Sequence, residues 1–394
     1  MAPDVRRRRR ASEQTGVAPV VRDGRPGGIA INAAVLRSPT ARHVMEKVYL
    51  AAPADDEILV RIHAAGFCHS DVLPRDPRFT GFPLIVGHEG AGIVEQVGSK
   101  VSRVAGGDHV VLTFQSCGHC QPCASGKPSY CDSFTKLNAS GRNDDGSTCV
   151  RDERGEEISA RWFGQSSFAT HALVTERNAV VVDSDLPLTL VAPLGCGIQS
   201  GAGAVMVTFD MKVGESLVVF GAGSVGLSAV LGARAVGASA IVAVDLHRAR
   251  LDMALELGAT HVFDAGAEDL VGRIREATGG GAHYAFDTTG VPNVISMAIA
   301  AIRKGGACGM VGAPTGELVI SQHDLNGKAL RRIVEGGVEP HEFIPKMVAL
   351  WRAGSFPFDK LIETFPLSHI NEAEQSSLSG LVIKPVLVPD EYVG

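Results

Sequence analysis

The chain has 394 residues, of which 45% are hydrophobic and 20% are charged, and its net charge is −6 at pH 7. This length is sufficient for two domains, and no segment approaches the ~20 uninterrupted apolar residues of a membrane span. The net charge is also negative, whereas nucleic-acid-binding proteins typically carry a basic patch or stripe. We therefore expect neither a membrane nor a nucleic-acid partner.

Residues 1–28 differ from the rest of the chain, because they carry a net charge of +4 and include five consecutive arginines, Arg6 to Arg10. Such a run can mark a nucleic-acid-binding or targeting segment, but neither an apolar stretch nor interleaved aromatic residues accompany it. A disordered extension, or a start codon assigned too far upstream, explains this composition better. The missing apolar core of an export signal favours a cytoplasmic location.

The next region, residues 29–197, alternates short β-type runs with glycine turns, for example at 57–62, 91–97 and 108–112. Such runs, bounded by turn residues, are typical of antiparallel sheets. We predict the first part of a largely β domain here.

Four cysteines lie within fifteen residues of this region: Cys117, Cys120, Cys123 and Cys131. Four thiolates at this spacing satisfy a tetrahedral zinc ion and hold a loop in shape. The alternatives are a coincidental spacing or two disulfides, but disulfides require export to an oxidising compartment. We therefore predict a structural zinc site, which does not by itself reveal what the protein does.

Three further possible zinc ligands are Cys68, His88 and Cys196, each next to glycine-containing segments. Two cysteines and one histidine leave the fourth zinc position open for water or substrate, as in catalytic sites. Taken singly, each cysteine is explained better as a small buried hydrophobic residue. Their flanking residues favour the catalytic interpretation.

A glycine-rich turn follows the apolar run at 216–220, and its predicted cofactor contacts are Gly221, Gly223, Ser224, Val225 and Gly226. A strand that turns through glycines into a helix brings backbone N–H groups close to a pyrophosphate. A second apolar strand, 240–244, ends in Asp245, where an acid would bind the adenosine ribose. Because this acid repels a 2′-phosphate, NAD is favoured over NADP, although Arg248 or Arg250 could accommodate the phosphate.

Residues 198–337 alternate strands with helical segments such as 248–257 and 293–303. This alternation predicts a doubly wound parallel sheet that binds the cofactor. The remainder, 338–394, is expected to return to the first domain. The active site should then lie in the cleft between the two domains.

These segments, in this order, resemble the zinc-dependent medium-chain alcohol dehydrogenases from about residue 29 to the C-terminus. The segments 68–71, 161–168 and 356–360 are most similar to aryl-alcohol (benzyl alcohol) and geraniol dehydrogenases. The resemblance implies an α/β protein with a doubly wound Rossmann cofactor domain and a largely β, GroES-like catalytic domain that carries a zinc lobe. It also implies two zinc ions and NAD per subunit, and a homodimer or homotetramer.

The activity implied by the resemblance is reversible oxidation of a primary aromatic or allylic alcohol to the aldehyde, with hydride transfer to NAD. Ser70 would accept the substrate proton, Asp71 would orient the imidazole of His88, and Glu89 would be a carboxylate close to the zinc. His69 and Lys384 would face the pyrophosphate, and Arg250 would lie at the cofactor. Without the resemblance, Ser70 and Asp71 are a turn or a helix cap, and the other charged residues are surface groups.

One position departs from the family pattern. Many members have a histidine five residues after the first zinc cysteine, where this chain has Leu73. Aryl-alcohol members often lack this histidine too, which supports the resemblance to them. With leucine at this position, proton release must use another route or water directly. Phe79, Phe82, Phe114 and Trp162 lie in segments that would suit a flat apolar substrate, although aromatic residues are more often core residues.

Two alternatives remain at this point. A thiol-dependent formaldehyde dehydrogenase would use the same machinery on an anionic adduct. A zinc-stabilised, non-enzymatic binding protein would use the cysteine lobe and the arginine tail for a macromolecular partner. The second alternative requires Cys68, His88 and Cys196 to be dispensable, and it leaves the glycine-rich turn and Asp245 without a role.

Overall fold

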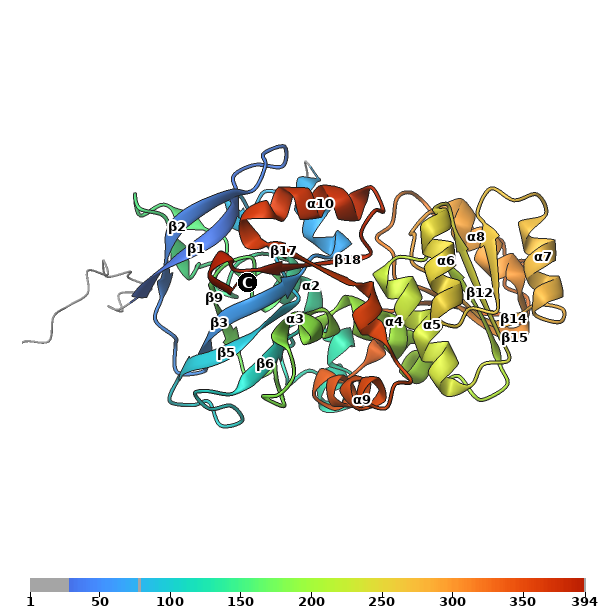
Figure 1. Ribbon diagram of the computed structural model, residues 1–394, viewed down its shortest axis with the longest axis horizontal. Helices are drawn as coiled ribbons and strands as arrows, with labels where there is room; N and C mark the ends of the chain where they lie inside the picture. Colours follow the sequence, from blue (N-terminus) through green and yellow to red (C-terminus); the bar gives the residue numbers. More distant parts are fainter. Residues whose placement is uncertain (1–27, 77–78, 393–394) are drawn as a thin grey trace, which may run out of the picture.

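The structure is a computed structural model that describes residues 28–76 and 79–392. Figure 1 shows a mainly β lobe, built from the first part of the chain and its C-terminal segment, beside an α/β lobe built from residues in between. The predicted basic tail, 1–28, lies outside the described residues except for Gly28, which begins strand β1.

The β lobe contains two sheets. The first has the order β4-β1-β2-β7-β8, and the second has the order β10-β6-β5-β3-β18-β17, with β9 also pairing with β3. Their strands are β1 (Gly28–Leu36), β2 (Val44–Ala51), β3 (Glu57–Gly66), β4 (Leu84–Ile85), β5 (Gly90–Val97), β6 (His109–Leu112), β7 (Val150–Arg151), β8 (Glu157–Ile158), β9 (His171–Thr175), β10 (Ala179–Val182), β17 (Ile362–Pro366) and β18 (Lys384–Val388). All pairings are antiparallel except that of β17 with β18.

Short helices connect these strands. The 3-10 helices that matter for the site are η1 (His69–Arg75), η3 (Trp162–Gly164) and η4 (Ala192–Gly195), together with η6 (Glu335–Gly337). The α-helices of this lobe and of the crossover are α1 (Gln121–Ala124), α2 (Phe134–Ala139), α3 (Leu188–Val191), α4 (Gly197–Gly203), α9 (Pro340–Arg352) and α10 (Ile370–Leu378).

The α/β lobe is a six-stranded parallel sheet with the order β13-β12-β11-β14-β15-β16. Its elements are β11 (Ser216–Phe220), α5 (Ser224–Val236), β12 (Ala240–Asp245), α6 (Arg248–Leu257), β13 (His261–Asp264), α7 (Leu270–Ala277), β14 (Ala282–Asp287), α8 (Pro292–Ala301), β15 (Ile302–Met310) and β16 (Ala329–Arg332). The order reverses between β11 and β14, and ligands of such sheets bind at the carboxyl ends of the strands at this switch point.

Strand β11 and helix α6 have the predicted bounds, but the helix predicted over 293–303 is wrong at its end. Helix α8 stops at Ala301, and β15 begins at Ile302, whose backbone is extended. Gly305, with a φ of +81°, and Gly306 follow directly, and glycines disfavour a continued helix.

The returning segment joins the first domain, because β18 pairs with β3 and β17 with β18. The strands of the parallel sheet all lie between residues 216 and 332. The division at 197/198 and 337/338 stays a prediction.

Helix α4 continues into a π-helical segment, 204–208, and packs directly on α5. A Cβ atom at Gly201 would lie only 2.0 Å from the carbonyl oxygen of Val225, so this close approach requires glycine. In the described part of the chain no single helix is long and apolar enough to cross a membrane. One bent pair, 188–195 with 197–208, meets the length and composition criteria together, but most of its residues are buried in the hydrophobic core.

Candidate metal and cofactor site

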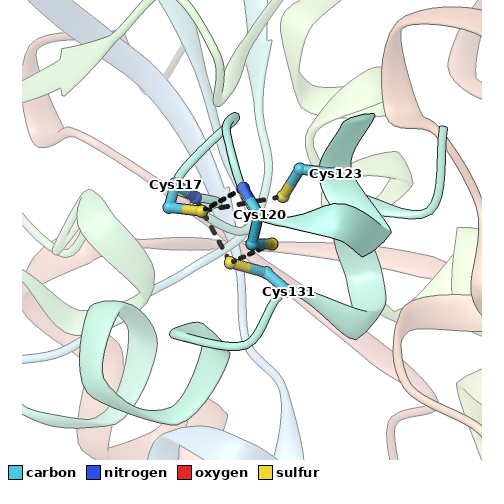
Figure 2. Close-up of side chains that lie close together, drawn as sticks. All are labelled: Cys117, Cys120, Cys123 and Cys131. Atoms are coloured by element: carbon cyan, nitrogen blue, oxygen red, sulfur yellow. Dashed lines mark hydrogen bonds between the residues drawn. The ribbon is translucent and has the colours of Figure 1, made fainter. Parts of the chain in front are cut away.

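The four cysteines predicted to hold structural zinc point toward one another in a loop that includes α1 (Figure 2). The sulfur atoms of Cys117 and Cys123 are 4.0 Å apart, and those of Cys120 and Cys131 are 3.9 Å apart. Tetrahedral Zn–S bonds of about 2.3 Å place sulfur atoms about 3.8 Å apart, whereas a disulfide requires about 2.05 Å. The loop therefore fits a zinc ion.

Electrostatics in this loop also favour a cation. Burial opposes ionisation of Cys117, but the backbone N–H groups of His119 and Cys120 outweigh it and lower the pKa of the thiol to about 7. Burial raises the pKa of Cys123 to about 12. Four thiolates this close together repel one another, and a divalent cation would supply the compensating positive charge.

A second cluster lies where the two lobes meet. The ligand atoms of Cys68, His88, Glu89 and Cys196 all lie within 4.8 Å of one another, and all four residues are buried. Cys68 directly precedes η1, the adjacent His88 and Glu89 lie between β4 and β5, and Cys196 separates η4 from α4. The structure thus brings together the three predicted ligands of the catalytic zinc, over 128 residues of sequence.

Asp71 orients the imidazole in this cluster. Its Oδ1 lies 2.8 Å from Nδ1 of His88 and accepts a hydrogen bond from the backbone N–H of Gly87 at 3.0 Å. Its Oδ2 accepts from the backbone N–H of Cys68 at 3.1 Å. Asp71 is therefore a helix cap and a partner of His88 at once, so the two interpretations offered by the sequence both apply.

The thiols of Cys68 and Cys196 lie next to each other in this cluster. The hydrogen bond between them is the main cause that lowers the pKa of Cys68 and raises the pKa of Cys196, with the charge of Lys384 also favouring the Cys68 thiolate. The Nε2 atom of His88 is buried without a hydrogen-bond partner. One proton between two sulfurs and an orphaned imidazole nitrogen fit a zinc ion.

Glu89 and Lys384 form a buried ion pair beside this cluster. Both side chains are 0% exposed, and Nζ of Lys384 lies 2.9 and 2.8 Å from the two carboxylate oxygens. Burial raises the pKa of Glu89 to about 7 in spite of the lysine. The alternative that Glu89 and Lys384 are surface residues is therefore wrong. A Cβ atom at Gly197 would lie close to both of them and to Ser224 on the glycine-rich turn.

The glycine-rich turn has the shape of a phosphate cradle. Gly221 has a φ of +92°, and a Cβ atom at Gly226 would lie 1.9 Å from its carbonyl oxygen. At Gly223, by contrast, a Cβ atom would meet nothing within 4 Å, so the turn is open there. Helix α5 begins at Ser224 without a side-chain cap, which leaves its first N–H groups available to a pyrophosphate.

Asp245 ends β12 and lies beside this turn. Its Oδ2 accepts a hydrogen bond from the backbone N–H of Ala222 at 2.6 Å, and its Oδ1 accepts from that of His247 at 2.8 Å. Arg250 lies 3.8 Å from the same carboxylate, whereas Arg248 pairs with Asp252 on the surface. Of the two arginines, only Arg250 lies at the predicted ribose site.

Three other residues of η1 are more exposed than Asp71. His69 is exposed, Ser70 is half-buried, and Leu73 is 43% exposed. Position 73 therefore has access to water.

Two residues next to the cluster were not predicted. Phe163 stacks on the imidazole of His88, with ring centroids 4.3 Å apart, and Glu335 contacts Cys196. Both have positive φ values, 49° and 47°. A non-glycine residue in this conformation carries no sequence signal, although Gly336 and Gly337 indicate a turn at Glu335.

Further aromatic rings adjoin Phe163. Trp162 contacts it edge-on at 5.5 Å, and Phe79 in turn contacts Trp162 at 6.0 Å and Phe82 at 5.4 Å. Phe114 lies on another side, against Phe134 at 5.6 Å. Trp162 and Phe114 are buried, while Phe79 and Phe82 are half-buried.

Comparison with known proteins agrees with this geometry. Residues 54–184 match the alcohol dehydrogenase GroES-like domain, and residues 224–351 match the zinc-binding dehydrogenase family. Geraniol dehydrogenase from Castellaniella defragrans is 48% identical over 91% of this chain and 98% of its own length. The chain belongs to the zinc-dependent alcohol dehydrogenases. Zinc and NAD are accordingly its cofactors, and its substrates are small alcohols and aldehydes.

Solved structures of this family confirm the predicted fold class. An alcohol dehydrogenase zinc-binding domain protein from Burkholderia ambifaria is 46% identical, with a TM-score of 0.90 over 92% of this chain and 100% of that one. Benzyl alcohol dehydrogenase from Acinetobacter calcoaceticus is 39% identical, with a TM-score of 0.88 over 91% and 99%. Family membership rules out the alternative of a non-enzymatic binding protein.

Proposed function

We propose that this alcohol dehydrogenase oxidises primary aromatic or allylic alcohols reversibly to aldehydes, with NAD as the hydride acceptor. The observation that carries the proposal is the stack of Phe163 on His88 at 4.3 Å, because it brings a flat apolar surface to the predicted catalytic metal. Geraniol and benzyl alcohol, named for two of the similar proteins, are an allylic and an aromatic primary alcohol.

In this proposal Cys68, His88 and Cys196 hold the catalytic zinc, and Asp71 fixes the ring of His88 through the 2.8 Å contact. When bound, zinc supplies the charge that acidifies the alcohol, and NAD accepts the hydride. Ser70 Oγ accepts the hydroxyl proton while its own O–H proton passes on toward water. Lys384 balances the charge of Glu89, so that this carboxylate stays close to the two thiols without a bare negative charge.

The aromatic residues around the cluster support the substrate class. Phe163, Trp162 and Phe79 form successive ring contacts that start at His88, and a flat apolar substrate gains favourable edge and face contacts with such rings. An anionic thiol adduct would instead require cationic groups next to this path.

We further propose a cytoplasmic homodimer or homotetramer. None of the eight cysteines, which all lie in the described part of the chain, forms a disulfide, in keeping with a reducing compartment. Strand β16 lies at the edge of the parallel sheet, and such an edge can pair with a second copy of the chain. Light scattering on the purified protein measures the assembly directly.

A panel of alcohols tests the substrate proposal. Turnover with NAD should be highest for benzyl-type and geraniol-type alcohols, lower for short aliphatic alcohols, and lower for hydroxymethyl-thiol adducts. A preference for the thiol adduct would replace the proposal by a thiol-dependent formaldehyde dehydrogenase. Parallel assays with NADP check the cofactor.

A further inference from the structure

Glu335 is a buried carboxylate that the proposed chemistry does not use. It lies three residues beyond β16 and is 7% exposed. Its φ of +47° is in the left-handed region, which costs a non-glycine residue about 1 kcal/mol. Glycine would adopt this conformation without that cost, so the contacts of the side chain have to offset it.

These contacts all go to the beginning of α4. One oxygen of Glu335 lies 3.4 Å from Sγ of Cys196. The other accepts hydrogen bonds from Nε2 of Gln199 at 3.2 Å and from Oγ of Ser200 at 3.4 Å. The carboxylate thus ties a predicted zinc ligand and the first turn of α4 to the segment that follows the cofactor-binding sheet.

Helix α4 is closely packed on two faces. A Cβ atom at Gly203 would lie 3.1 Å from the Cα atom of Gly336, next to Glu335. On the other face, Gly201 approaches the backbone of Val225 in α5, the helix that begins at the glycine-rich turn. Cys196 therefore lies where the metal cluster, the end of the parallel sheet and the cofactor helix converge.

The charge of Glu335 also acts on the metal cluster. Gln199 and Ser200, which donate hydrogen bonds to Glu335, are both neutral, so a carboxylate at this position would attract a cation bound by Cys196. Loss of a group that positions metal ligands typically costs about 10- to 100-fold in metal affinity or activity.

We propose that Glu335 is a positioning residue for the catalytic zinc, which strengthens the hold of Cys196 on the metal and links it to the cofactor domain. This inference rests on the proposed function, since it requires zinc at Cys68, His88 and Cys196. It predicts that metal retention, and not only turnover, depends on Glu335 and on bound NAD.

Three variants of the zinc-loaded enzyme separate the contributions of charge, side-chain contacts and backbone strain at position 335. Glu335→Gln keeps an acceptor and the side-chain shape but removes the charge, and Glu335→Ala removes both. Glu335→Gly removes the backbone strain as well. Glu363→Gln, an exposed site on β17, is the matched control. Zinc per subunit is followed during dialysis against a chelator, with and without NAD, and the absorption of the cobalt-substituted enzymes is recorded.

We expect Glu335→Ala and Glu335→Gly to lose one of two zinc ions at least about tenfold faster than the wild type, with Glu335→Gln in between. NAD should slow this loss in the wild type and much less in the variants, and the thiolate-to-cobalt absorption should shift. The control should match the wild type.

Wild-type rates of zinc loss in Glu335→Ala, with an unchanged cobalt spectrum and full protection by NAD, would overturn the inference even if turnover fell. Should Glu335→Ala fail to fold, the same result in Glu335→Gln decides against it. A wild-type enzyme with a single zinc ion would instead overturn the proposed function, and this inference with it.

Discussion

At Asp71, one carboxylate holds three segments together: it accepts from the N–H groups of Cys68 and Gly87 and contacts Nδ1 of His88. An imidazole fixed through Nδ1 presents Nε2 to the metal. The two residues are 17 positions apart, and the contact is fully buried. Single residues of this kind determine whether the ligands meet in a geometry suitable for zinc.

His43 is a second buried residue, whose titration should affect stability rather than catalysis. Burial lowers the pKa of its imidazole below the ordinary 6.5, although Glu374 at 3.6 Å opposes this. The neutral form therefore stabilises the fold fully above pH 6.5, and this stability is lost as the pH falls through the lower folded-state pKa. We expect the melting temperature to fall on acidification from about pH 7.5 to about pH 5.5.

The variant His43→Gln should lose less melting temperature over the same pH range, because glutamine does not titrate. The hydrogen bonds of residue 43 to Asn371 use its backbone and are kept. His323→Gln, at an exposed position, is the control and should follow the wild type. Equal pH profiles for all three proteins would contradict the role of His43.

Leu73 offers a test of proton release. Its side chain is 43% exposed and lies one helical turn beyond Ser70 in η1. A histidine at this position titrates near neutrality and can pass a proton to water. We expect Leu73→His to raise turnover several-fold at about pH 6 to 7 and less at about pH 9, if proton release limits the rate.

Ser70→Ala provides the control for this relay, because it should be severely impaired with either leucine or histidine at position 73. Normal turnover of Ser70→Ala would contradict the relay. If turnover of a deuterated alcohol shows no isotope effect, product release limits the rate. Leu73→His would then leave turnover unchanged.

Among the elements, the four-cysteine loop is the one whose shape depends on a metal. Its four sulfur atoms lie close together without a long helix or strand to support them, since α1 spans only Gln121–Ala124. Gly118 adjoins the guanidinium of Arg177, whose backbone oxygen accepts from Nε2 of His341 in α9. Loss of the loop would therefore also disturb the contact with α9.

We expect Cys120→Ala to remove one zinc ion and to lower the melting temperature by roughly 5 °C or more, because structural zinc contributes folding energy directly. Cys196→Ala should instead keep a melting temperature close to that of the wild type while turnover falls by orders of magnitude. Zinc content and thermal melting of the two purified variants distinguish these outcomes. Normal turnover of Cys196→Ala would contradict its assignment to the catalytic zinc.

Individual elements with a local sequence pattern could be predicted from the sequence. The bounds of β11 and α6 and the four clustered cysteines follow from apolar runs, helix periodicity and ligand spacing, which involve neighbours in the chain. The end of α8 was misjudged because the apolar run of the helix continues into β15. The sequence indicates Lys384 and Glu89 as site residues. Their contact with each other spans 295 residues, so no local pattern predicts it.

Across the whole molecule, the cofactor site joins parts of the chain that are far apart. Asp245 ends β12 and Arg250 lies in α6, whereas Gly380, in the C-terminal segment that returns to the β lobe, lies next to Arg250 and His247. Phe163 and Glu335 could not be predicted for the same reason, since their roles arise only when distant segments fold against the metal cluster. A ligand bound at such a junction should stabilise the entire fold.

Cofactor choice should therefore be visible in thermal melting. A ligand that binds only the folded state at about 100 times its Kd adds about 2.7 kcal/mol of stability. NAD should raise the melting temperature more than NADP at equal concentration, because the carboxylate of Asp245 repels a 2′-phosphate. Asp245→Asn removes the charge while keeping an acceptor for the N–H of Ala222, which is 2.6 Å away in the wild type.

We expect Asp245→Asn to shift the ratio of NAD to NADP affinities toward NADP by about tenfold, or about 1.4 kcal/mol. Arg248→Gln is the control, because Arg248 pairs with Asp252 on the surface and should leave the ratio unchanged. Arg250→Gln addresses the remaining possibility, since Arg250 lies 3.8 Å from Asp245. An unchanged ratio in Asp245→Asn together with a changed one in Arg250→Gln would mean that the guanidinium, and not the carboxylate, selects the cofactor.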